Sequence, residues 1–240
     1  MNIEAAKIIS KVTLPSKTVK IKLLGDSITH GVGGSKFSQN GEPIVREFAR
    51  NPNGYCWANR FKDFMESSYD SKVTNNACTG TTIEFIIENF DSLVDRDDDI
   101  VICTIGTNNR HQYFDRGEKH TKREHMEEFY GNIRKLHGMF KNAGIDVVFV
   151  ANIPASAKNE EDGENYWRIF HMNDVRDMYI KASAELGFPL ILMYNRFLEY
   201  CKNTGTELDD LLADGLHPNN KGYDVMFDIM LDELGLARCV

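Results

Sequence analysis

The fold of this chain is decided by one stretch near its start, Val19-Lys20-Ile21-Lys22-Leu23-Leu24-Gly25-Asp26-Ser27-Ile28. Its first six residues alternate and then become apolar, which is typical of a strand that enters a buried sheet. The strand pattern stops at Gly25, where a glycine allows the backbone to turn sharply. Ser27 therefore follows the carboxyl end of a strand, which is the edge at which parallel α/β sheets bind their ligands.

Further strands and helices alternate along the rest of the chain. Strand-like segments lie near residues 72–76, 99–105, 145–152 and 189–194. Helical periodicity covers residues 55–69, 81–93, 122–142, 166–186 and 221–234. With right-handed crossovers, this alternation predicts a three-layer α/β/α sandwich around a parallel, flavodoxin-like five-stranded sheet.

Length and composition predict one domain. The chain has 240 residues, of which 42% are hydrophobic and 27% charged, and no repeat, low-complexity tract or Gly/Ser linker divides it. We therefore expect residues 1–240 to form a single domain, with residues 1–17 as an N-terminal extension packed on it.

Charge and hydropathy argue against several classes of partner. The formal net charge of −8, without a basic run, argues against nucleic acid and against an anionic membrane. No segment reaches transmembrane length. The acidic run at residues 95–99 precedes a strand and is expected to be a solvated turn rather than a metal site.

The first ten residues and the cysteines predict the cellular compartment of the protein. The first ten residues carry an early acidic residue and no sustained apolar core, so they do not resemble a signal peptide. The five cysteines are odd in number and widely spaced, which is typical of free thiols in a reducing compartment. We expect a cytoplasmic protein, although a chain that has lost its leader would read the same way.

A second motif near the end of the chain complements Ser27. In Asp214-Gly215-Leu216-His217-Pro218, the aspartate and the histidine are three residues apart, so a turn brings them to one side. The carboxylate can then accept the Nδ1 proton of His217, which leaves Nε2 free to take a proton from Ser27. Pro218 disfavours a helical His217 and places this residue on a loop.

Two small-residue loops follow the strands near residues 72–76 and 99–105. One contains Gly80 and the other contains Asn108. A backbone N–H at Gly80 and a side-chain amide at Asn108 can join the Ser27 N–H as donors to an oxyanion. Each motif alone is more often structural, for example a helix cap or a surface turn. Together the motifs favour an acyl-transfer site.

In this order, Gly-Asp-Ser, an isolated glycine, Gly-x-Asn and Asp-x-x-His resemble the SGNH hydrolases, also called GDSL esterases. The resemblance extends from about Val19 to the C-terminal helix. It implies Ser27 as nucleophile, His217 as base with Asp214 behind it, and an oxyanion hole formed by Ser27, Gly80 and Asn108.

Two positions depart from the family pattern. Asn109 stands where many members have aspartate, and Ala77 stands where many have glycine. We expect the first to alter loop support more than chemistry and the second to alter the conformation of the Gly80 loop. We also expect Asp26, Asn109 and Tyr113 to contact substrate.

The segments near residues 30–53, 110–120 and 153–165 show neither strand nor helix pattern and follow strands that lead to the predicted site. Long loops at such an edge often shape the substrate pocket. Aromatic side chains in or beside these loops can line it, namely Phe37, Tyr55, Trp57, His111, Tyr113, Phe114, Tyr166 and Trp167. The histidine spacing matches no zinc site, so we predict no metal and no cofactor.

Together these patterns predict a serine esterase acting on a small-molecule or carbohydrate ester, with acetyl preferred because no extended apolar lid is present. A lysophospholipase, a thioesterase or an acyltransferase on longer acyl chains is the alternative within the same chemistry. A non-catalytic carbohydrate-binding module is the alternative from another class. A dinucleotide-binding protein is disfavoured, because residues 25–31 lack the required glycine spacing. The sequence does not indicate an oligomeric state.

Overall fold

A computed structural model describes residues 1–13, 17–38, 51–110, 121–161 and 168–236. Its five strands are β1 (Val19–Gly25), β2 (Ser71–Asn75), β3 (Ile100–Thr104), β4 (Asp146–Val150) and β5 (Leu190–Ile191). All neighbouring strands pair in parallel, in the order β2-β1-β3-β4-β5. The predicted flavodoxin-like parallel sheet is therefore confirmed.

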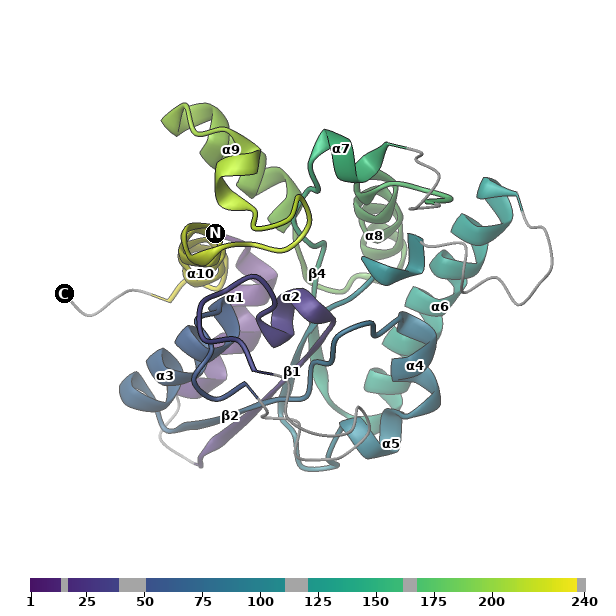
Figure 1. Ribbon diagram of the computed structural model, residues 1–240. Helices are drawn as coiled ribbons and strands as arrows, with labels where there is room; N and C mark the ends of the chain where they lie inside the picture. Colours follow the sequence, from purple (N-terminus) through teal and green to yellow (C-terminus); the bar gives the residue numbers. More distant parts are fainter. Residues whose placement is uncertain (14–16, 39–50, 111–120, 162–167, 237–240) are drawn as a thin grey trace.

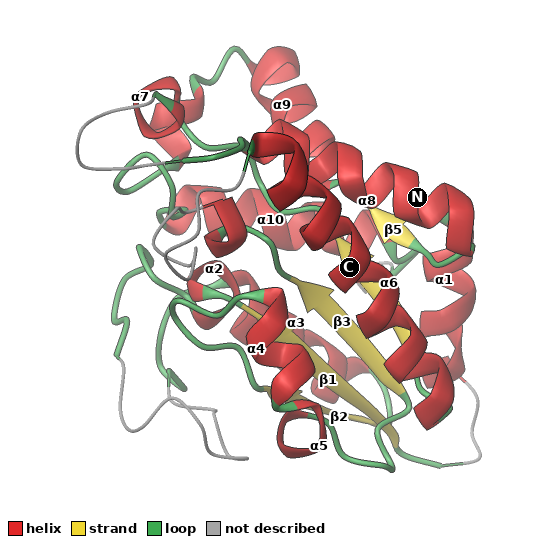
Figure 2. Cartoon of the chain, turned by 90° about the vertical axis from the view of Figure 1, so that its right-hand side faces the viewer, coloured by secondary structure: helices red, strands yellow, loops and turns green. Residues whose placement is uncertain are grey.

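Helices cover both faces of this sheet (Figures 1 and 2). The helices are α1 (Ile3–Ile9), α2 (Ser27–His30), α3 (Trp57–Ser68), α4 (Ile83–Glu88), α5 (Phe90–Leu93), α6 (Lys122–Ala143), α7 (Ala157–Glu160), α8 (Met172–Leu186), α9 (Met193–Thr204) and α10 (Asn220–Glu233). Short 3-10 turns lie at Ser10–Thr13, Asn108–Arg110 and Leu208–Leu211. Helices α1, α3 and α10 lie on one face, and α4, α6 and α8 lie on the other (Figure 1).

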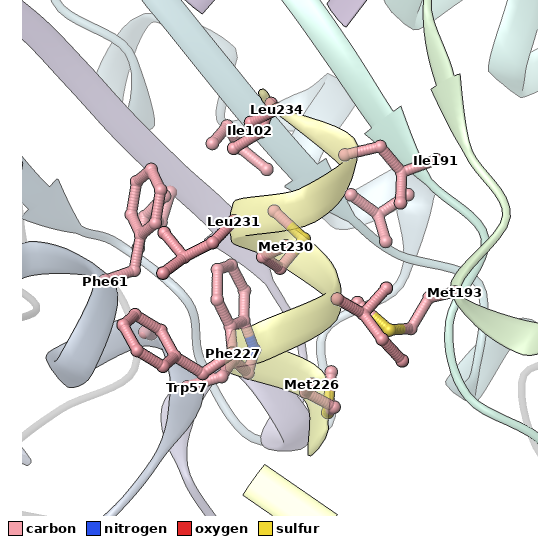
Figure 3. Close-up of a cluster of buried hydrophobic side chains, with 14 of the residues drawn as sticks. Trp57, Phe61, Ile102, Ile191, Met193, Met226, Phe227, Met230, Leu231 and Leu234 are labelled. Carbon is pink, nitrogen blue, oxygen red and sulfur yellow. The ribbon is translucent and has the colours of Figure 1, made fainter. Parts of the chain in front are cut away.

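Each face of the sheet has its own apolar core. On one face, Met226, Phe227 and Met230 of α10 form one cluster with the α3 side chains Trp57 and Phe61 (Figure 3). Helices α6 and α8 form the equivalent cluster on the other face. Strand β3 is buried along its whole length, as expected for the centre of a sheet covered on both sides.

Several helix ends follow from local sequence. Helix α6 starts with a capping box, in which Thr121 and Glu124 exchange hydrogen bonds. It ends at Gly144, whose φ of 72° is in the left-handed region that glycine adopts most readily. Residues 1–13 contribute α1, whose Ala5 and Ile9 are buried in the first core cluster.

The sequence-based assignments were wrong in several places, among them the helix predicted over residues 166–186, which begins only at Met172. The helix predicted over residues 81–93 is divided at Asn89, whose side-chain amide donates to the carbonyl of Phe85. The last strand is only Leu190–Ile191, because α9 begins at Met193. Helices α1 and α9 were not predicted; an apolar run such as residues 190–194 does not by itself distinguish strand from helix.

Candidate active site

Ser27 lies at the point where β1 ends and α2 begins. Asp26 caps this helix, because its Oδ1 accepts a hydrogen bond from the Ile28 N–H at 3.0 Å. Gly25 is required by space, since a Cβ there would lie 2.4 Å from Thr104 Oγ1 and 2.8 Å from the Thr104 carbonyl oxygen. The close approach of β1 to β3 therefore sets the position of the serine. The two strands form the switch point of the 2-1-3-4-5 sheet, where ligands of such folds bind.

His217 lies against Ser27 across 190 residues of sequence. Its Nε2 is 2.8 Å from Ser27 Oγ, and its Nδ1 is 2.7 Å from Asp214 Oδ2. The other carboxylate oxygen of Asp214 accepts the backbone N–H groups of Leu216 and His217. These contacts form one continuous hydrogen-bonded chain from carboxylate to imidazole to hydroxyl.

The loop that carries His217 is held by backbone contacts. The Ala213 N–H donates to the His217 carbonyl at 2.7 Å, and Leu212 and Pro218 form an isolated β-bridge. Gly33 packs beneath it, with a φ of 92° and no room for a Cβ, which would lie 2.5 Å from the Pro218 carbonyl oxygen. The histidine is therefore on a loop, as Pro218 predicted, and the loop is fixed on two sides.

The three hydrogen-bonded side chains, Ser27, His217 and Asp214, differ in exposure and charge. Ser27 is buried, whereas the Asp214 side chain is 54% exposed. Partial burial alone would raise the pKa of Asp214, but hydrogen bonds from the backbone and the ring of His217 outweigh it and lower the pKa. Asp214 is thus an ionised acceptor at neutral pH, which favours the His217 tautomer that carries its proton on Nδ1.

Gly80 and Asn108 lie on adjoining loops after β2 and β3. The Asn108 side chain is almost fully buried, and its Nδ2 donates to the Thr81 carbonyl at 2.9 Å, so it joins the two loops. Gly80 has a φ of 81°, and no backbone hydrogen bond among the described residues uses its N–H. The structure therefore leaves the Gly80 N–H and the second amide hydrogen of Asn108 as donors at the edge that carries Ser27.

Two predicted substrate contacts have other partners in the structure, and the third lies outside it. Asp26 has no exposed surface, and its carboxylate caps α2, which does not favour the predicted substrate contact. Asn109 accepts from the Ile83 N–H and donates to Glu84, so its amide is engaged at the start of α4. Tyr113 lies outside the described residues.

Sequence reasoning missed a polar cluster beneath Ser27. Asn152 follows β4, and its Nδ2 lies 3.1 Å from Thr107 Oγ1 and 3.5 Å from Asp26 Oδ2. Burial raises the pKa of Asp26, while hydrogen bonds from Thr107 and Ile28 act in the opposite direction. Asn152 follows a strand at the carboxyl edge, as Asn108 does, and that position was the signal for it in the sequence.

The described aromatic residues mostly pack rather than line a pocket. Trp57 is fully buried in the core, and Tyr55 donates a hydrogen bond to Asp224. Phe37 packs edge-on against the ring of His30, with centroids 5.3 Å apart. The other predicted pocket aromatics, His111, Tyr113, Phe114, Tyr166 and Trp167, lie outside the described residues.

The described residues contain no cluster of three or more His, Cys, Asp or Glu side chains that could hold a metal ion. Within the same ranges, no helix is both long enough and apolar enough to span a membrane.

Solved structures share this fold over most of their length. The chain matches the acetylxylan esterase Axe2 from Geobacillus stearothermophilus at a TM-score of 0.66 and 16% identity, covering 93% of this chain and 98% of that one. It matches the lipase/acylhydrolase from Enterococcus faecalis at a TM-score of 0.63 and 21% identity, covering 90% and 95%. LAE5, an alpha/beta hydrolase from the metagenome of Lake Arreo, matches at 0.67 and 18%, covering 92% and 97%. No curated protein matches the sequence.

The parallel sheet, with a serine, a histidine and a carboxylate in hydrogen-bonded sequence at its carboxyl edge, defines a serine hydrolase. The sequence profile of the GDSL-like Lipase/Acylhydrolase family matches residues 23–225, and the chain belongs to this family. The resemblance drawn from the short motifs is thereby confirmed.

Proposed function

We propose that this serine hydrolase cleaves short acyl esters, above all acetyl esters of carbohydrates or small molecules, with Ser27, His217 and Asp214 as its catalytic triad. The observation that carries the proposal is the unbroken hydrogen-bonded chain from Asp214 through His217 to Ser27 Oγ. A serine nucleophile is activated when a base lies within hydrogen-bond distance of it and a third group orients that base.

The reaction follows from this geometry. His217 Nε2 takes the Ser27 proton as Oγ attacks the ester carbonyl, and the tetrahedral intermediate carries a negative oxygen. Collapse breaks the bond to the alcohol, which leaves with the proton returned by His217. Water then repeats the sequence on the acyl-serine and releases the carboxylic acid. Asp214 holds the ring orientation and stabilises the imidazolium that forms twice in each cycle.

Three donors would stabilise the negative oxygen: the N–H groups of Ser27 and Gly80 and the amide of Asn108. Their placement on adjoining loops, with Asn108 fixed to the Thr81 carbonyl, supports this assignment. Donors of this kind act because they are already oriented when the charge develops.

The preference for a short acyl group is supported by the fold, which is that of an acetylxylan esterase as well as of a lipase/acylhydrolase. Longer-chain lysophospholipase, thioesterase or acyltransferase activity is the competing assignment. A non-catalytic carbohydrate-binding module would not require the intact Ser27–His217 contact.

The test compares the wild-type protein with Ser27→Ala on p-nitrophenyl esters of increasing acyl length and on acetylated xylo-oligosaccharides. We expect hydrolysis of acetyl and propionyl esters that is lost in Ser27→Ala. Maximal activity on longer chains would contradict the acetyl preference but leave the serine mechanism intact. Equal rates for wild type and Ser27→Ala on every ester would contradict the catalytic assignment, and glycan binding would then be measured directly.

A further inference from the structure

Arg110 is a fully buried arginine two residues after Asn108. Its relative exposure is 0%, although a guanidinium is charged at any physiological pH and rarely leaves solvent without partners. Burial lowers the pKa of Arg110 to about 10, which still leaves it protonated at neutral pH. A cation at this depth beside the candidate oxyanion loop needs a structural or functional reason.

The contacts of Arg110 tie three segments together. Its Nε donates to the Thr107 carbonyl at 3.0 Å, and its Nη1 donates to Glu160 Oε2 at 2.8 Å. The Arg110 carbonyl accepts from the Ile169 N–H at 2.8 Å. One residue therefore joins the turn after β3, the short helix α7 and the segment that leads into α8.

Glu160 continues this connection on its other side. Its Oε1 accepts from the Met172 N–H at 3.1 Å, at the first turn of α8, and the His171 Nδ1 lies 3.6 Å from its Oε2. The Glu160 side chain is only 18% exposed, so the Arg110–Glu160 pair is shielded from water and salt. Such pairs hold their geometry better than exposed ones do, because guanidinium and carboxylate have few other partners.

The remaining Nη2 of Arg110 is buried and has no hydrogen-bond partner among the described residues. A buried donor without a partner is costly, so stability alone does not account for an arginine at this position. By contrast, the hydrogen bond from Arg110 Nε to the Thr107 carbonyl is made one residue before Asn108. It spans the short 3-10 turn Asn108–Arg110.

We propose that Arg110 is a positioning residue: with Glu160 it fixes the Thr107–Asn108 turn and thereby orients the Asn108 amide toward the reacting carbonyl. This inference rests on the proposed function, in which Asn108 is an oxyanion donor. The pair links that donor to the loop at residues 153–161, so a change in this loop would be transmitted to the oxyanion hole. Misplacement of a donor by a fraction of an ångström is enough to weaken its effect on the transition state.

The kinetic test uses Arg110→Met, Arg110→Lys and Glu160→Gln on p-nitrophenyl acetate. We expect Arg110→Met to lower kcat by roughly 10- to 100-fold with KM within about threefold, since a transition-state contact is lost. Arg110→Lys retains the charge but cannot donate to both partners in a fixed fork, so it should recover only part of the rate. Glu160→Gln keeps the shape of the side chain and should fall between Arg110→Lys and wild type.

Lys22→Met is the matched control, since Lys22 is also a buried cation that pairs with carboxylates, at the opposite edge of the sheet. It should lower the melting temperature while kcat stays within about twofold. The same kcat in folded Arg110→Met as in wild type, or a change in KM alone, would overturn the proposal.

A double-mutant cycle tests whether Arg110 acts through Asn108. In an Asn108→Ala background, Arg110→Met should cost less than about threefold, because the donor that it positions is already absent. Additive losses would show that Arg110 acts by another route. If Arg110→Met does not fold, Arg110→Lys and Glu160→Gln serve in the same cycle.

A spectroscopic measurement separates this inference from the proposed function. In ¹⁵N-labelled protein, the side-chain amide of Asn108 is assigned by its absence in Asn108→Ala. Glu160→Gln and Arg110→Lys should shift this resonance, and Lys22→Met should not. An unmoved resonance overturns the positioning role even if Ser27-dependent hydrolysis is found; a shifted one supports it even if the ester assignment fails.

Discussion

The two edges of the sheet both gather charged residues, but they do so in opposite ways. At the amino edge, lysines of β1 pair with the acidic run that precedes β3: Lys22 Nζ lies 2.9 Å from Asp95 and 3.5 Å from Asp98. Lys20 pairs with Asp97 in the same run. Each of these cations thus has a carboxylate beside it. The run is therefore not the simple solvated turn that the sequence suggested, since Asp98 is itself buried.

At the carboxyl edge, two charged groups are buried with incomplete pairing. Asp26 has hydrogen bonds but no ion pair among the described residues, and burial raises its pKa; Arg110 has an orphaned Nη2. Unmatched groups cost stability, yet they remain available to a developing charge. The comparison indicates that the first edge contributes to stability and the second to catalysis, and the following variants test that division.

The largest effect is expected from His217→Ala. Without this imidazole no group accepts the Ser27 proton, so kcat should fall by about 10³-fold or more. Because the His217 side chain is near the surface, the melting temperature should change little. Ester hydrolysis and thermal denaturation of the same preparation measure both quantities. A fall in kcat below tenfold would remove His217 from the role of base.

A smaller but clear effect is expected from Asn108→Ala. Loss of one oxyanion donor should lower kcat on the order of 100-fold with little change in KM. Asn109→Ala is the matched control, because its amide supports α4 and Glu84 rather than the site. Full activity in Asn108→Ala, or equal losses in both variants, would contradict the assigned oxyanion hole.

Much of this arrangement was predictable from local sequence. Strands appear as apolar runs, and the Ser27, Asn108 and His217 motifs each follow such a run or precede a helix. Asn152 and Arg110 were missed because their importance comes from contacts with Asp26 and Glu160, which no local spacing encodes. For the same reason, the internal roles of Asp26 and Asn109 were not foreseen: burial depends on how the loops pack together.

At the amino edge, Lys22→Met should destabilise the fold by about 2 kcal/mol and leave kcat unchanged. Its removal leaves the buried Asp98 without a cation, although protonation of that carboxyl limits the cost. Lys20→Met should cost far less stability, because both side chains of the Lys20–Asp97 pair are exposed to solvent. Urea denaturation of the two variants measures the difference. Equal costs would mean that burial does not distinguish the two pairs.

The smallest effect, and the sharpest test of the comparison, is expected from Asp26→Asn. Burial raises the pKa of Asp26 in the folded protein, so the native state binds more protons than the unfolded chain between the unfolded and folded pKa values. The ionisable group therefore causes stability to fall as pH rises through that window, and the loss persists at neutral pH. The Asp26→Asn variant would lack this cost, while the oxygen of its side-chain amide can still accept from the Ile28 N–H.

We therefore expect Asp26→Asn to be as stable as wild type or more stable at pH 7, by about 1 kcal/mol at most, with the difference vanishing below the unfolded pKa of about 3.9. Its kcat should nevertheless fall, because the carboxylate lies directly beneath Ser27 and faces the Asn152 amide. Melting temperatures across pH 3–8, with kcat at pH 7, test both parts. A variant that is less stable at pH 7 than at pH 4, relative to wild type, would show that the buried carboxylate stabilises the fold, and the two edges of the sheet would then not differ in the way proposed.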